Sequence, residues 1–152
     1  MKYLAALLVA ALFFAGLPAT ATDAGDEILG TWNTTGNDSK VEIFKVKNKY
    51  AAKIISLKEP NWPANDEQGM SGKPKNDRNN PNPELRNRPI VGLQIMQDFV
   101  PAGKNLWEQG KIYDPESGKT YKCKMKLIST NRLEVHGYVG FSLLGRTVTW
   151  TR

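Results

Sequence analysis

From Tyr121 to Leu127, every second residue is apolar and each residue between them is a lysine. This two-residue period is that of a β-strand with one buried face and one solvated face. It predicts that Tyr121, Cys123 and Met125 point into the interior of the fold, while the lysines form a solvated outer face that discourages edge pairing. The only cysteine is therefore expected to be a small buried apolar residue rather than a reactive or intermolecular thiol.

Further segments are rich in β-branched and aromatic residues and end at glycine, proline or asparagine turns. Outside the N-terminal stretch, no segment has a helical period. We therefore predict an all-β domain, a single up-and-down antiparallel barrel of eight strands, because closure removes exposed sheet edges. A β-sandwich is the alternative. The expected strands are 28–34, 40–47, 50–57, 90–99, 106–113, 119–128, 132–137 and 145–152, with one long loop, 58–89, between strands three and four.

The N-terminus has the three parts of a cleavable signal peptide. Lys2 precedes an apolar run over 3–17, Pro18 ends that run, and Ala19 and Ala21 are the small residues that a signal peptidase reads. The run is short for a permanent membrane span, although a retained anchor is the alternative. We expect residues 1–21 to be the signal peptide, residues 22–152 to be the barrel domain, and the protein to be periplasmic or secreted.

The formal net charge is +6, and the basic residues are scattered along the chain. A positive domain in a cell envelope is attracted to anionic lipids and glycans. Nucleic acid is not an expected partner, because no basic run forms a phosphate-binding patch.

No catalytic or metal-binding constellation is evident in the sequence. The single histidine, His136, falls on the outer face of its strand, and no serine sits on a nucleophile elbow. One cysteine and one histidine do not make a zinc site. Asp77 and the asparagines near it either bind calcium or, as the adjacent prolines favour, form side-chain-to-backbone turns. We predict no metal and no cofactor.

Several motifs together resemble one family. Gly30-Thr31-Trp32 begins the first strand, as in lipocalins and the wider calycin group. More distinctive are the runs within 72–89, 113–121 and 143–152. In combination they resemble the bacterial exported proteins grouped as domain of unknown function 2147, and the resemblance covers nearly the whole chain after the signal peptide. It implies a lipocalin-like barrel, and it supplies no catalytic residue to carry over.

Strand counting then places two residues at a closed floor. In an up-and-down barrel, strand one starts at the end where strand eight finishes, so Trp32 and Arg152 are expected to meet there. An arginine over this tryptophan would close the floor by packing and cation–π contact, as in lipocalin-like barrels. Arg146 lies about 20 Å earlier along the strand and belongs near the opposite end.

Four connections meet at that opposite end, among them the long loop and the turn between strands seven and eight. Long loops often act as lids, and an apolar rim around a mouth favours a ligand entrance. One alternative is that the apolar residues plug a solid barrel. Another is that Arg86 and Arg88 tie the long loop to the barrel rim through backbone carbonyls and Asp77 or Glu84, instead of meeting an anionic head group. The predicted ligand mouth comprises Trp62, Arg86, Arg88, Phe141, Leu143, Leu144 and Arg146.

Three function classes follow. The first is an exported lipocalin-like module that binds a small apolar or amphipathic ligand, such as an envelope lipid; this rests on analogy of fold. The second is a module that binds a protein partner or is structural in the envelope, inhibitor-like, with a solid barrel. The third is an enzyme, which would need convergent polar groups such as Tyr121 and Arg146. An empty apolar interior favours the first.

Overall fold

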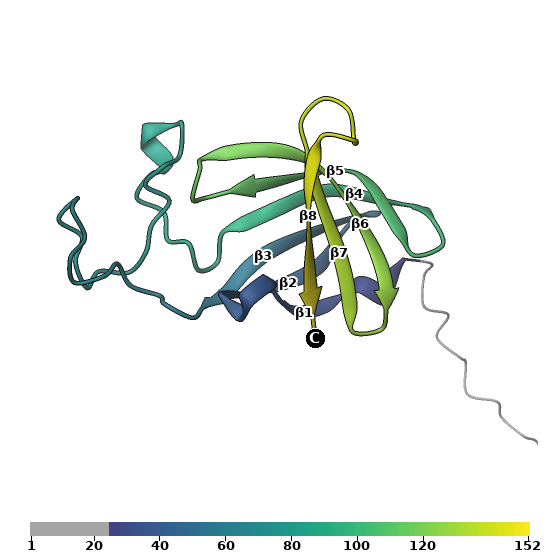
Figure 1. Cartoon of the computed structure of the whole chain (residues 1–152), viewed down its shortest axis with the longest axis horizontal. Coiled ribbons are helices and arrows are strands. Elements are labelled where there is room, and N and C mark those ends of the chain that lie inside the picture. Colours follow the sequence, from purple (N-terminus) through teal and green to yellow (C-terminus); the bar gives the residue numbers. More distant parts are fainter. Residues whose placement is uncertain (1–24) are drawn as a thin grey trace, which may run out of the picture.

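The computed structural model describes residues 25–152, and the predicted signal peptide lies outside them. Eight antiparallel strands follow one another around a closed barrel in chain order, which confirms the predicted architecture (Figure 1). Within the described residues, no helix is long and apolar enough to cross a membrane. The strands are β1 (Gly30–Asn33), β2 (Ser39–Val46), β3 (Lys49–Leu57), β4 (Gln94–Gly103), β5 (Leu106–Asp114), β6 (Lys119–Ser129), β7 (Arg132–Tyr138) and β8 (Gly145–Thr151).

The predicted starts of strands one and four are wrong. Asp26–Ile28 is a 3₁₀ turn, η1, because the Leu29 amide bonds back to the Asp26 carbonyl. Residues 90–93 belong to the long loop: the Ile90 amide donates to the carbonyl of Lys75, and Gly92 turns the chain with a φ of 92°. Glycine adopts such a φ without strain, and the chain turns here before β4 begins.

Large aromatic side chains pack the end of the barrel that contains η1. Trp32, Phe99 and Trp107 are at most 1% exposed there. Gly110 makes this packing possible, because a Cβ at its position would lie 2.4 Å from the Phe99 ring. A β-bulge at this point, with Gln109 at a φ of 63°, lets the β5 backbone pass directly under that ring.

Arg152 closes the same end, which we call the floor. Its guanidinium carbon lies 4.3 Å from the centre of the Trp32 ring. Its nitrogens donate to the carbonyls of Thr130, Leu29 and Glu27 at 2.6, 2.9 and 2.9 Å. One side chain therefore ties the β6–β7 turn, η1 and the start of β1 together beneath the tryptophan.

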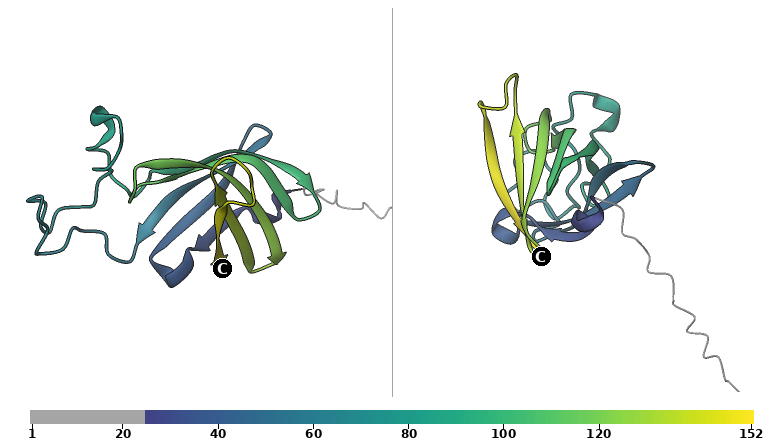
Figure 2. Two further views of the ribbon diagram at one scale, coloured as in Figure 1. Left: turned by 45° about the horizontal axis from the view of Figure 1, so that its top comes forward. Right: turned by 90° about the vertical axis from the view of Figure 1, so that its right-hand side faces the viewer.

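The long loop leaves the barrel between β3 and β4 and extends to one side of it (Figure 2). It contains one short 3₁₀ turn, η3 (Pro83–Leu85), and two isolated bridges, Asn61 with Pro74 and Asn76 with Pro89. These bridges fold the loop back on itself, so it leaves and rejoins the barrel at the end opposite the floor.

Candidate ligand-binding cavity

The half of the barrel away from the floor contains a cavity of about 1020 Å³. Thr34, Lys58, Pro115 and Val139 line it, one from each of the four connections at this end. The ring of connections forms the mouth, as strand counting predicted. The barrel is thus packed at one end and unfilled at the other, rather than solid throughout. Apolar residues of the strands and the long loop also line the cavity, among them Ile54, Ile90, Ile95, Ile112, Val135, Val148 and Trp150.

On β7 the inward side chains become smaller towards the mouth, which leaves part of the cavity open. On β7 the inward series is Leu133, Val135 and Gly137, of which Leu133 is fully buried and the other two line the cavity. A Cβ at Gly137 would lie 3.6 Å from Ile112 and 3.8 Å from Tyr121, which is ordinary contact. The glycine therefore marks space that a side chain could occupy without a clash.

The predicted interior residues of β6 become less buried towards the mouth. Met125 and Cys123 are at most 1% exposed, whereas Tyr121 is half-buried and lines the cavity. Burial raises the pKa of the Cys123 thiol to about 12. At neutral pH the thiol carries its proton, so Cys123 has the character of a buried apolar residue and not of a nucleophile.

Basic and acidic side chains surround the mouth. Arg146 lines it from the start of β8, and Lys58 and Lys75 line it from the long loop. None of the three has an ion pair with another described residue. Arg78 also lines it but pairs with Asp66 at 2.6 Å, and this hydrogen bond is the main cause that lowers the pKa of the Asp66 carboxyl. Arg146, Lys58 and Lys75 are therefore the cations available to an anionic group at the mouth.

Trp62 forms part of the cavity wall and is held there from two sides. Its indole nitrogen donates to the Asn76 side-chain oxygen at 3.0 Å. The guanidinium of Arg78 lies 3.4 Å from the ring centre, a close cation–π arrangement. The indole is thus fixed by the loop itself, and its place in the mouth does not depend on a ligand.

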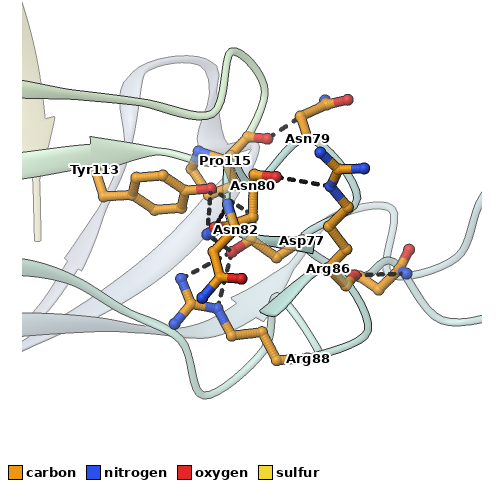
Figure 3. A network of polar contacts seen from close by, with 9 residues as sticks. Asp77, Asn79, Asn80, Asn82, Arg86, Arg88, Tyr113 and Pro115 are labelled. Atoms are coloured by element: carbon orange, nitrogen blue, oxygen red, sulfur yellow. Dashed lines mark hydrogen bonds and ion pairs between the residues drawn. The ribbon is translucent and has the colours of Figure 1, made fainter. Parts of the chain in front are cut away.

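Arg86 and Arg88 do not line the cavity, so their assignment to the mouth is wrong. Arg88 pairs with the fully buried carboxylate of Asp77 at 2.8 Å, and Arg86 donates to the Asn80 carbonyl at 2.8 Å (Figure 3). A buried carboxylate requires such partners. The alternative is right that both arginines have structural partners, a carbonyl and Asp77, but these partners belong to the long loop and not to the barrel rim.

The Asp77 carboxylate also joins the long loop to the barrel. The Tyr113 hydroxyl on β5 donates to it at 2.6 Å, and the Asn80 amide donates to it at 2.8 Å (Figure 3). Burial and this carboxylate raise the pKa of Tyr113. Asp77 and its asparagines therefore form turns and a loop anchor. Among the described residues, no three histidine, cysteine, aspartate or glutamate side chains are grouped to hold a metal ion.

A second contact of the loop explains Gly118. The Asn79 side chain donates to the Glu116 carbonyl at 2.8 Å. A Cβ at Gly118 would lie 2.0 Å from the Asn79 backbone oxygen, and Gly118 has a φ of 69°. Only glycine allows the β5–β6 turn to lie this close to the loop.

The predicted apolar turn divides into two groups. Leu144 and Arg146 line the cavity, but Phe141 and Leu143 do not, and they are 82% and 94% exposed. The turn is closed by its own backbone, with the Leu144 amide donating to the Phe141 carbonyl at 3.0 Å. Phe141 and Leu143 thus point into solvent, and their assignment to the mouth is wrong.

Sequence reasoning did not identify Tyr113, Arg78 and Gly137 as parts of this region. Gly137 was detectable, since it continues the inward series of β7. Tyr113 and Arg78 were not, because their roles depend on contacts with a loop that has no periodicity.

Both comparisons that match the chain agree with this geometry. The model of the family described as "Uncharacterized protein conserved in bacteria (DUF2147)" matches residues 30–152. The chain belongs to this family. It is also similar to the solved structure of protein HP1028 from Helicobacter pylori, described as belonging to the lipocalin family. The two share 31% sequence identity with a TM-score of 0.67, over 82% of this chain and 81% of that one. No curated protein matches the chain.

Proposed function

We propose that this DUF2147 protein is an exported lipocalin-like binding protein that holds a small amphipathic molecule in the cavity at the mouth of its barrel. The observation that carries the proposal is the unfilled volume of about 1020 Å³, whose lining combines aliphatic side chains of the strands with polar and charged side chains of the connections. Pockets of this size and character accommodate small-molecule ligands. Export to the cell envelope, where amphipathic lipids are abundant, is part of the proposal and is tested by whether the mature protein begins at Thr22 in an intact-mass measurement.

Two parts of the cavity have different roles in this proposal. Ile112 and Val135 contact the apolar portion of the ligand, since both line the interior. Arg146 meets its anionic head group, because it lines the mouth without an ion pair to any described residue. A guanidinium donates bidentately to carboxylate or phosphate.

Binding of a dansyl-labelled fatty acid tests the proposal. Gly137→Leu places a side chain in the cavity and is expected to abolish binding, whereas Gly137→Ala, which adds only the Cβ, is expected to retain most of it. Arg146→Met should weaken binding of the acid at least about tenfold, because the charge-assisted hydrogen bonds to the head group are lost, and should leave binding of the matching fatty alcohol unchanged. Unaltered binding to Gly137→Leu, or no binding to the native protein, would reject the cavity as the site.

A further inference from the structure

The turn between β7 and β8 carries a cluster of exposed apolar side chains, which we call the apolar tip. It consists of Val139, Phe141, Leu143 and Leu144, which are 67%, 82%, 94% and 70% exposed. In Figure 1 the turn is the yellow loop that projects beyond the barrel at the end of β7 and β8, and Figure 2 shows the same projection from the side. Adjacent exposed apolar side chains of this kind mark an interaction surface.

The apolar tip is held in a fixed shape. His136 has a ring nitrogen 2.8 Å from the Ser142 carbonyl oxygen, and its other ring nitrogen lies 2.8 Å from the Thr147 hydroxyl. Gly145 allows the close approach, because a Cβ there would lie 2.4 Å from the Gly137 carbonyl oxygen. These contacts hold the backbone of the turn, so its shape does not depend on packing of its apolar side chains. Phe141 and Leu143 are therefore presented outward by an ordered hairpin, while Val139 and Leu144 lie between them and the mouth of the cavity.

The outer face beside the tip is basic. Lys122 pairs across the sheet with Tyr138, and Lys124 pairs with His136, so both lysines lie along the outer face of β6 near the tip. Neither lysine has an ion pair with another described residue. The whole chain carries a net charge of +6. This surface therefore combines a small apolar projection with unneutralised positive charge.

We propose that the apolar tip inserts into the surface of an anionic lipid bilayer and that the β6 lysines lie against its head groups. The footprint favours a bilayer over a protein, since a stable protein interface needs about 20–30 residues from each partner. Shallow insertion into the interfacial layer needs only a few apolar side chains assisted by basic residues. The inference does not depend on the cavity holding a ligand, although insertion would bring the mouth to the membrane.

Co-sedimentation with phosphatidylcholine vesicles, with and without phosphatidylglycerol, tests this. The native protein should associate with the phosphatidylglycerol vesicles and less with the neutral ones. Phe141→Ser/Leu143→Ser should weaken association at least about tenfold, because two large apolar side chains no longer leave water. Ile128→Ser is the matched control: Ile128 is 42% exposed but lies at the floor end of β6, and its removal should change nothing.

Fatty-acid binding in the absence of vesicles separates this inference from the proposed function. Phe141 and Leu143 do not line the cavity, so the double variant should bind the dansyl probe as the native protein does. Gly137→Leu should abolish binding of the dansyl probe and leave association with the vesicles unchanged. Equal association of the native and double-variant proteins, or no preference for phosphatidylglycerol, would overturn the inference. So would a native dimer in sedimentation velocity that the double variant lacks, because the tip would then be a contact between copies.

Discussion

Arg152 provides the sharpest test of how the barrel is closed. Its guanidinium donates to the carbonyls of Glu27 and Leu29, and Trp32 donates its indole N–H to the carbonyl of Ile28 at 2.8 Å. The two side chains hold consecutive carbonyls of η1 and also contact each other. Removal of one should therefore weaken what the other contributes.

The expected magnitudes follow from these contacts. Trp32 is fully buried, so Trp32→Ala should lower the free energy of unfolding by about 3–5 kcal/mol. Arg152→Ala removes three hydrogen bonds that are open to solvent and one cation–π contact, for a loss of about 2 kcal/mol. The double variant should lose about 1 kcal/mol less than the sum of the two.

Urea denaturation followed by far-ultraviolet circular dichroism measures all three variants without relying on tryptophan fluorescence. Arg132→Ala is the control, because this exposed arginine lies at the same end of β7 and makes no ion pair with a described residue. Its effect should stay within about 0.5 kcal/mol. If the losses in free energy of unfolding of Trp32→Ala and Arg152→Ala add strictly, the proposal that the two side chains jointly hold η1 is refuted.

Two further predictions concern buried titratable groups. Cys123 should react with a thiol reagent slowly in the native state and rapidly in urea, because burial raises its thiol pKa from 9.0 to about 12; fast native labelling would contradict its burial. Burial and the Asp26 carboxylate likewise raise the pKa of Tyr50 from 10.0 to about 12. Folding favours the protonated form of both groups. Their contribution to the free energy of unfolding should therefore be fully present below about pH 9 and should be lost as the pH rises towards 12. In urea denaturation at a series of alkaline pH values, Tyr50→Phe should show a smaller decrease of the unfolding midpoint than the native protein. An unchanged pH dependence would contradict the role of Tyr50.

The periodic parts of the chain were predictable from the sequence. Alternation on β6 placed Cys123 inside, since a strand with one solvated face has only two side-chain orientations. Strand counting put Arg152 at the floor and Arg146 at the mouth, because an up-and-down barrel fixes which ends meet. Neither step needed knowledge of individual contacts.

The long loop was not predictable in the same way. Its anchor joins Asp77 to Tyr113, which are 36 residues apart, and the choice between an arginine that binds a ligand and one that ties the loop depends on that contact. The same applies to Phe141 and Leu143, whose direction is set by a turn and not by a strand period. Composition identified these residues as unusual, but only packing assigns their direction.

The division of the barrel into a packed floor and an unfilled mouth separates stability from binding. Trp32 and Phe99 bury their apolar surface at the floor, so the fold does not rely on a full interior near Gly137. A leucine at Gly137 would bury apolar area in open volume and replace a glycine that weakens a strand interior. Gly137→Leu should therefore raise the free energy of unfolding by about 1 kcal/mol while it abolishes probe binding. A loss of stability instead would show that the space beside Ile112 is already needed by the folded core.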